Sequence, residues 1–216
     1  MTYLEIVNNV LKRLREREVT NVNENAYSTL IGILVNDAKT EVENTWKWSA
    51  LRTTMTITTS ANLFSYTLTG TDNNFDTLNV LNDTDDWFLE YKPAKEMDKL
   101  FLGTPTTETG SPKYYSFNGV DSNGDTQIDL YPIPDGEYTI RYNMVKRSAD
   151  LSNDADNVTV PAMPVIMLAY AKAIEERGED AGIASSSAYA VAQKHLSDYV
   201  SLDGAKHPEE LEWYTV

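Results

Sequence analysis

Residues 160–202 constrain the fold of this chain most, because they carry two helical patterns that cannot be stable alone. In the first, apolar residues recur at three- and four-residue steps, the period of one helix face: Met163, Ile166, Met167, Tyr170, Ala173 and Ile174. In the second, the same steps recur: Ala188, Val191, Ala192, His195, Leu196, Tyr199 and Leu202. An apolar stripe must be buried against another element. The sequence therefore predicts two helices that fold back on each other and pack against further helices.

The ends of these two helices carry residues that are typical of helix termini. Pro164 suits the first turn of the first helix, where a missing backbone N–H costs nothing. Gly178 suits its end, since glycine readily adopts the left-handed conformation found there. For the second helix, the serines at 185–187 offer N-caps and Gly204 offers a stop.

The first 50 residues carry two more helical patterns, which are the expected packing partners. Residues 2–5, Thr-Tyr-Leu-Glu, have the form of a capping box, and we expect a helix over about residues 3–17. A cap region at residues 21–25 precedes a longer helix that ends near Trp46 and Trp48. Two Trp residues two positions apart cannot share one helix face, so they indicate the exit from helix to strand.

Between residues 50 and 148 the apolar period changes to 2, which indicates β-strands. The predicted strands cover residues 51–58, 64–68, 77–81, 87–91, 114–117, 127–131 and 137–145. We expect the first two strands to form one hairpin. We expect the last two to form another, across the turn residues Pro134, Asp135 and Gly136. A short helix is expected over residues 93–102.

These patterns together predict an α+β fold, a discontinuous α-helical bundle with an inserted antiparallel β domain. The expected divisions are 1–49 for the N-terminal helical part, 50–148 for the β-rich insert, 149–203 for the C-terminal helical part and 204–216 for an extended C-terminal tail. Within the third division, residues 149–157 form a polar, acidic linker back to the bundle.

The charge balance argues against stable binding to nucleic acid. The chain has 33 Asp and Glu against 18 Lys and Arg, a formal charge of −15, whereas a protein that grips phosphates needs a basic face. Basic residues cluster at 12–17, where a solvated helix end is a simpler explanation than a nucleic-acid patch.

With no Cys, disulfides and thiolate chemistry are excluded. No signal sequence or long apolar run is visible, so we expect a soluble protein made in the cytoplasm, without membrane contact.

The candidate chemical sites have simpler structural interpretations. Residues 121–125 offer oxygen ligands in a calcium-type pattern, but Thr126 replaces the required glycine and Pro132 the required glutamate. An Asn-Gly turn explains the pattern better. His195 is interpreted as a buried histidine with one hydrogen bond and His207 as a loop histidine. No nucleophile elbow or phosphate-binding loop is present. We therefore expect no catalytic, cofactor or metal site, and no enzyme.

Two other functions stay open from the residues alone. A glycan-hydrolysing module would use some of the many paired carboxylates, none of which stands out. A glycan- or receptor-binding module is suggested by the aromatic residues at 87–91 and 114–115, which a β-sandwich core explains more simply.

Three segments resemble tailed-bacteriophage head-to-tail adaptor (connector) proteins. They are the opening at residues 1–16, the Trp46-Lys47-Trp48 helix end followed by a Leu-Arg-Thr strand, and residues 169–180, which are similar to that family's third helix and turn. The resemblance covers nearly the whole chain in the order of its elements, while residues 70–125 match no pattern of the family.

The resemblance implies a virion structural protein, a dodecameric ring between portal and tail that extends the DNA channel. The implied partners are the portal protein, a tail tube or nozzle protein and further copies of the chain. DNA would pass through without specific binding during genome ejection, and the ring, assembled in the host cytoplasm, would lie at the virion neck. The C-terminal tail of this chain, residues 204–216, would dock on the portal or on a neighbouring subunit. Its contact residues would be Leu211, Trp213, Tyr214 and Val216. Ring contacts are expected at Arg13, Arg15, Arg17 and Tyr189. A tail-associated glycan-binding or glycan-hydrolysing module is the alternative.

Overall fold

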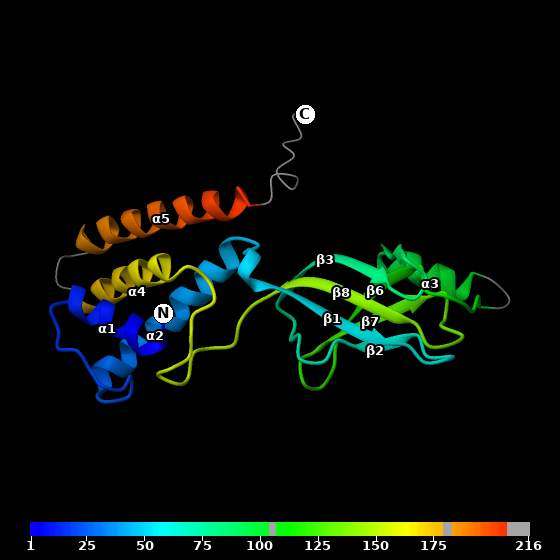
Figure 1. Ribbon diagram of the computed structural model, residues 1–216, viewed down its shortest axis with the longest axis horizontal. Coiled ribbons are helices and arrows are strands. Elements are labelled where there is room, and N and C mark those ends of the chain that lie inside the picture. Colours follow the sequence, from blue (N-terminus) through cyan, green and yellow to red (C-terminus); the bar gives the residue numbers. More distant parts are fainter. Residues whose placement is uncertain (104–106, 179–182, 207–216) are drawn as a thin grey trace. The chain divides into compact units, whose positions relative to one another are not determined.

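A computed structural model of the chain describes residues 1–103, 107–178 and 183–206 (Figure 1). Its helices and strands confirm the predicted α+β class. The helices are α1 (Tyr3–Arg13), α2 (Ala26–Thr45), α3 (Ala94–Leu102), α4 (Ala162–Arg177) and α5 (Ile183–Gly204), with a 3-10 turn at Ser49–Leu51. The strands are β1 (Arg52–Thr58), β2 (Ser65–Thr67), β3 (Phe75–Asn82), β4 (Trp87–Phe88), β5 (Glu90–Tyr91), β6 (Tyr114–Val120), β7 (Thr126–Tyr131) and β8 (Thr139–Lys146). Contacts divide the chain into a helical unit, residues 1–51 with 147–216, and a β unit, residues 52–146.

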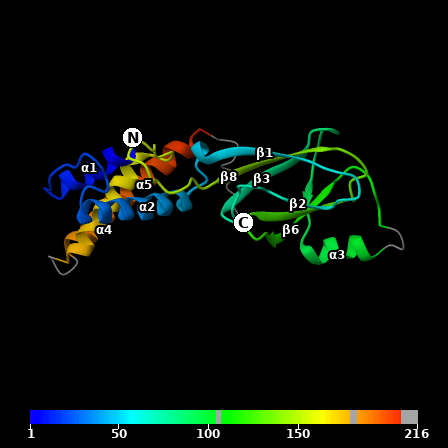
Figure 2. The ribbon, with the colours of Figure 1, turned by 90° about the horizontal axis from the view of Figure 1, so that it is seen from below.

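Helix α4 is the central element of the helical unit. It contacts α1, α2 and α5, and it lies beside α5 in both views (Figures 1 and 2). Residues 164–169 are all buried, so this helix is covered on every side and not on the single face that was predicted. The cause is its central position, since a helix surrounded by others has no solvent face. As predicted, it ends where Gly178 adopts a left-handed φ of 62°.

Helix α1 has the predicted start and an earlier end. The Thr2 hydroxyl accepts from the Glu5 N–H at 3.2 Å and the Glu5 carboxylate accepts from the Thr2 N–H at 2.9 Å, which confirms the capping box. The helix ends at Arg13, four residues before the predicted limit of 17. The Asn8 amide explains this difference, because it bonds both backbone groups of Val19 at 2.9 Å and holds the following loop against α1.

Helix α2 leads into the β unit as the two tryptophans predicted. It starts at the Asn25 cap, and its C-terminal neighbour Trp46 is already extended. Trp48 is buried, and its indole N–H donates to the Val42 carbonyl at 2.7 Å. The 3-10 turn follows, and β1 begins at Arg52.

Helix α5 departs from its predicted apolar face. Ala188, Ala192 and Leu196 are buried, but Val191 is 42% exposed and Leu202 is 64% exposed. The helix packs mainly against α4, so only a narrow stripe is covered. The serines at 185–187 are not caps either, because the helix begins before them, at Ile183.

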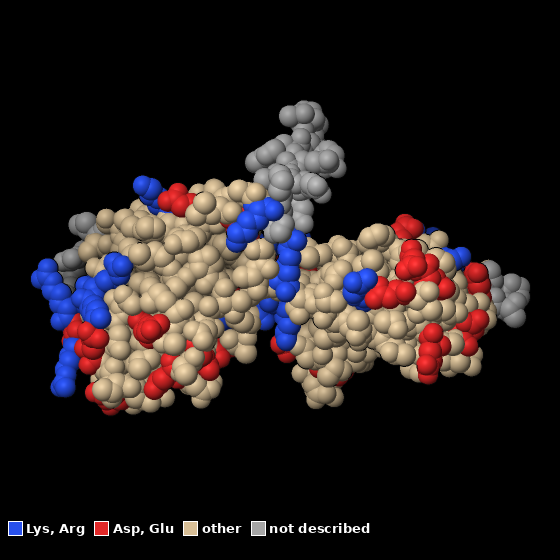
Figure 3. Space-filling view, viewed as in Figure 1, with Lys and Arg blue, Asp and Glu red and all other residues tan. Residues whose placement is uncertain are grey.

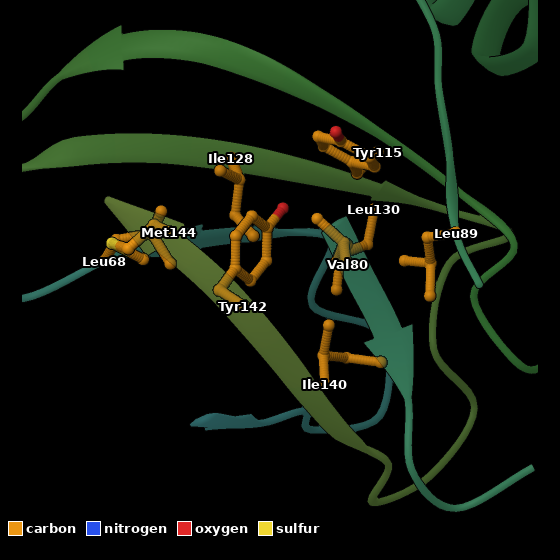
Figure 4. Packing of buried hydrophobic residues seen from close by; sticks show 9 residues of the cluster. All are labelled: Leu68, Val80, Leu89, Tyr115, Ile128, Leu130, Ile140, Tyr142 and Met144. Carbon is orange, nitrogen blue, oxygen red and sulfur yellow. The ribbon is translucent and has the colours of Figure 1, made fainter. Parts of the chain in front are cut away.

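The β unit is a sandwich of two four-stranded sheets, in the orders β1-β8-β3-β4 and β2-β7-β6-β5. All pairings are antiparallel except β5 with β6. Side chains from both sheets meet in one core (Figure 4). These core residues are Leu68, Val80, Leu89, Tyr115, Ile128, Leu130, Ile140, Tyr142 and Met144. The side of β8 that faces the core, with Ile140, Tyr142 and Met144, is therefore the one that the alternation of apolar and polar residues predicted.

Both predicted hairpins are wrong, although their strands exist. β1 pairs with β8 and β2 pairs with β7, so the members of each expected hairpin lie in different sheets. Residues 59–64 and 132–138 carry the chain from one sheet to the other. Period-2 alternation tells which side of a strand is buried but does not name its partner. The predicted strand at 87–91 is likewise divided, since β4 pairs with β3 and β5 with β6.

The Tyr142 hydroxyl gives a stability prediction. It is fully buried in the core, and within the described residues it has no hydrogen-bond partner. Burial raises the pKa of this phenol well above its usual value. Tyr142→Phe should leave the free energy of unfolding unchanged or raise it by up to about 1 kcal/mol, because no hydrogen bond is lost and an unpaired polar group is removed. Urea unfolding measures this, and a loss of 1 kcal/mol or more would contradict it.

Candidate assembly surfaces

The basic cluster of the sequence lies exposed at the C-terminal end of α1. Lys12 and Arg13 occupy the last turn of the helix, and Arg15 and Arg17 lie in the loop that follows. In Figure 3, Lys and Arg side chains gather at this end of the helical unit. Lys12 pairs with Glu18 at 3.1 Å, with both side chains more than half exposed. The three predicted arginines are therefore accessible to another protein.

Arg177, at the end of α4, holds this basic loop in place. Its guanidinium donates to the Tyr27 hydroxyl at 2.9 Å and lies 5.3 Å from the centre of that ring. It also donates to the Leu14 carbonyl and to the Glu16 carboxylate. A hollow of about 320 Å³ opens beside it, with Arg17 in its wall. The bonds from Arg177 therefore fix the loop against the helical unit, with a hollow beside it.

A second hollow lies on the helical unit between α1, the start of α4 and α5. This groove has a volume of about 380 Å³. Its lining is mostly apolar and includes Met163, Ile166 and Tyr199, and Arg13 lies at its wall. Sequence reasoning singled out Arg13 as a member of a basic cluster and as an expected ring contact. It missed the groove because three helices from distant parts of the chain form it.

Tyr189 occupies a different position from the arginines. Its hydroxyl donates to the Glu175 carboxylate at 2.7 Å, which links α5 to α4 inside one subunit. Burial, followed by the hydrogen bond to Glu175, raises the pKa of Tyr189 to about 12. The structure does not bring this residue together with Arg13 in the groove. Its predicted role in ring contacts stays a prediction.

Asp203 anchors the end of α5, just before the tail. Its carboxylate accepts from the Ser49 N–H at 2.9 Å, the Ser49 hydroxyl at 2.6 Å and the Trp46 indole N–H at 3.2 Å. Burial opposes the charge on this carboxyl, but the bonds from Ser49 and Lys206 outweigh it and lower the pKa of Asp203 to about 2. Sequence reasoning did not single out Asp203, since nothing in the local sequence marks it.

Asp203→Asn should therefore destabilise the protein in a pH-dependent way. The folded pKa of about 2 lies below the ordinary value of about 3.9, so the stabilisation is present above pH ~4 and is lost as the pH falls toward 2. We expect a loss of about 2–3 kcal/mol at pH 6, shrinking toward zero near pH 2. Urea unfolding at several pH values measures it. The same deficit at every pH would show that the carboxylate charge is not the cause.

The four predicted docking residues of the tail, Leu211, Trp213, Tyr214 and Val216, lie outside the described residues. His207 does too. The last described residue is Lys206, whose ammonium group donates to the Asp203 carboxylate at 2.9 Å. The point from which residues 207–216 depart is therefore anchored to the helical unit.

In the β unit, the calcium-type loop uses its oxygens within the protein. One Asp121 carboxylate oxygen accepts from the N–H groups of Asn123 and Asp125. Asp125 accepts from Gly70 at 2.9 Å and from Asp72 at 3.0 Å, and these bonds lower the pKa of its carboxyl, Gly70 contributing most. Over the described ranges, no group of three or more potential ligands could hold a metal ion. Nor is any described helix long and apolar enough to cross a membrane.

Some of the aromatic residues that suggested glycan binding are structural. Tyr115 belongs to the sandwich core and its ring centre lies 5.8 Å from that of Tyr142. The half-buried Trp87 donates from its indole N–H to the Pro112 carbonyl at 3.0 Å. Phe88 and Tyr91 are exposed. The simpler interpretation, a β-sandwich core, thus accounts for the buried members of this set.

Comparison of the sequence with known proteins and with models of protein families identifies the family of this chain. A search of the curated proteins finds no match. The family model described as SU10 adaptor protein matches residues 1–209, which include all five helices and all eight strands. The match confirms the resemblance to phage adaptors that the opening, the Trp46–Trp48 segment and residues 169–180 carry. The chain belongs to the SU10 adaptor protein family.

Proposed function

We propose that this protein is a non-enzymatic virion component that forms a ring, dodecameric as the family resemblance implies, between the portal and the tail of a phage. The observation that carries the proposal is the family match over residues 1–209. The ring would extend the DNA channel at the virion neck, with the portal protein on one side and a tail tube or nozzle protein on the other. Assembly would take place in the host cytoplasm.

A closed ring requires heterologous contacts, in which two different patches of one subunit are complementary. The helical unit supplies concave and charged features of the kind that such contacts use. They are the groove at Arg13 and the hollow at Arg17. Arg13, Arg15 and Arg17 are all exposed there, which supports their proposed role in ring or portal contacts.

The acidic balance of the chain suits a DNA channel. A surface that binds DNA releases counterions through Lys and Arg, and affinity grows with the number of such contacts. A chain with a formal charge of −15 lacks the excess of cations for this. DNA would therefore slide through the ring without a specific or lasting contact.

The tail, residues 204–216, is the proposed docking element. Leu211, Trp213, Tyr214 and Val216 are its proposed contact residues, because large aromatic anchors supply most of the binding energy at protein interfaces. Asp203 holds the base of this tail to the α2 end of the helical unit, so the tail leaves from a defined position.

The test is reconstitution with the portal complex of the same virus. Purified protein is mixed with portal and viewed by negative-stain electron microscopy, and a new ring below the portal is expected. A variant without residues 207–216, or one with Trp213→Ala and Tyr214→Ala, should not form it, whereas the matched control Thr215→Ser should. A well-folded protein that binds no portal would contradict the proposed function.

A further inference from the structure

We propose that the groove between α1, α4 and α5 receives residues 207–216 of a second copy of this chain. The inference rests on the proposed ring and deepens it, because it names two surfaces that would meet between neighbouring subunits. The proposed occupant is an acidic and aromatic segment. An arginine and the apolar lining beside it would bind that segment.

The groove has apolar surface to cover. Met163, from the first turn of α4, and Tyr199, from α5, are partly exposed there, while Ile166 is buried in the wall of the groove. Met1, also at its edge, is 46% exposed. A concave site of this volume is typical of sites that bind another molecule. With a volume of about 380 Å³, the groove can take one or two large side chains and not a folded domain.

Arg13 gives the groove its charge preference. Its side chain is exposed, and among residues 1–103, 107–178 and 183–206 it has no ion-pair or hydrogen-bond partner. Acids outnumber bases 33 to 18 in this chain, and two nearby cations pair with acids, Lys12 with Glu18 and Arg177 with Glu16. Arg15 and Arg17 resemble Arg13 in being exposed, but neither of them lines this groove. A guanidinium left without an acid beside an apolar groove favours a ligand that brings carboxylates and apolar groups together.

Residues 207–216 have this composition. The segment reads His-Pro-Glu-Glu-Leu-Glu-Trp-Tyr-Thr-Val, three carboxylates next to large apolar side chains. Trp and Tyr are the side chains most often found as anchors in interface pockets, and Glu can pair with Arg13. Ten residues in extended form reach about 33 Å.

A second copy is the occupant that suits a ring. If the segment of each subunit enters the groove of the next, the same contact repeats in one direction around the ring, as heterologous assembly requires. A segment that returned to its own groove would leave no such contact. Charge complementarity between Arg13 and the three glutamates then contributes to the choice of partner as well as to binding.

Because the chain contains no Cys, disulfide trapping can test this in the full-length protein. Two single-cysteine variants, Asn9→Cys at the groove and Thr215→Cys in the segment, are mixed and oxidised, with and without the portal complex. Asn9 lines the groove. We expect a disulfide-linked pair made of one chain of each kind. Thr40→Cys, on exposed α2 surface, replaces Asn9→Cys as the control and should give little product.

Charge reversal then tests the role of Arg13. Arg13→Glu in the groove variant should lower the trapped yield about tenfold, while the matched reversal Arg15→Glu, at an exposed position outside the groove, should not. Changing Glu209, Glu210 and Glu212 to Lys in the segment variant should restore trapping with Arg13→Glu. No trapped pair under either condition, or equal trapping at Thr40→Cys, would overturn the proposal.

Two further outcomes separate this inference from its alternatives. A chain carrying both cysteines that closes only an internal disulfide would show that the segment returns to its own groove, which overturns docking between copies. If the full chain forms rings on the portal but no pair is trapped, the groove inference fails while the proposed function stands. If no ring forms either, the proposed function fails with it.

Discussion

Glu43→Ala is expected to destabilise the protein by about 3–5 kcal/mol, because it leaves a charged lysine buried without its partner. Lys39 and Glu43 lie one helical turn apart on α2, each with a side chain 1% exposed, and their Nζ and Oε2 atoms are 3.5 Å apart. Both also bond Ser148. The lysine donates to the Ser148 carbonyl at 2.9 Å, and the Ser148 hydroxyl donates to Glu43 at 2.5 Å.

The position of this pair explains the size of the effect. Ser148 lies where the chain has just returned from the β unit to the helical unit, so the pair fastens the segment after β8 to α2. Removing the carboxylate loses the bond from the Ser148 hydroxyl and leaves the ammonium desolvated without its counter-charge. Replacing both partners by Lys39→Met with Glu43→Leu should recover most of the stability, because no buried charge then remains.

Urea unfolding of the purified variants measures this prediction. Glu41→Ala is the matched control, since Glu41 also pairs with a lysine, Lys172, at the shorter distance of 3.0 Å but with 46% of the glutamate side chain exposed. Solvent screening limits such a pair to less than about 1 kcal/mol. Equal losses for Glu41→Ala and Glu43→Ala would show that burial does not determine the energetics here.

Trp48→Ala is expected to cost about 3–5 kcal/mol, because it empties the space of the largest fully buried side chain in the described residues. The indole is 1% exposed and its N–H donates to the Val42 carbonyl at 2.7 Å, near the end of α2. The substitution therefore creates a cavity and leaves a carbonyl without that donor at the point where the chain passes from helix to strand.

Thermal and urea unfolding of Trp48→Ala, Trp48→Phe and Lys47→Ala separate these contributions. Trp48→Phe keeps much of the volume but loses the hydrogen bond, so an intermediate loss is expected. Lys47 is exposed, and its substitution should change stability by less than about 0.5 kcal/mol. If Trp48→Ala unfolds with the same midpoint as Lys47→Ala, the indole is not a structural anchor.

Features that depend on near neighbours in the chain could be predicted from the sequence. The capping box at Thr2 and Glu5, the Gly178 helix end and the helix at 93–102 rest on contacts within a few residues. So does the inward side of β8, because alternation alone decides which side chains of a strand point the same way. The family resemblance also came from short segments of sequence.

Tertiary contacts decided the rest. Which strand β1 and β7 pair with depends on where the connecting segments cross between sheets, and both expected hairpins were wrong for that reason. Asn8 ended α1 early by binding Val19, and α5 covered less than its apolar pattern predicted because its main packing partner is one helix. The surroundings of Arg13 likewise exist only once α1, α4 and α5 have packed. Local patterns determined the elements, several of their ends and the inward side of β8. Strand partners, the end of α1, the covered surfaces of α4 and α5 and the groove depend on residues farther apart in the chain, whose contacts no local pattern encodes.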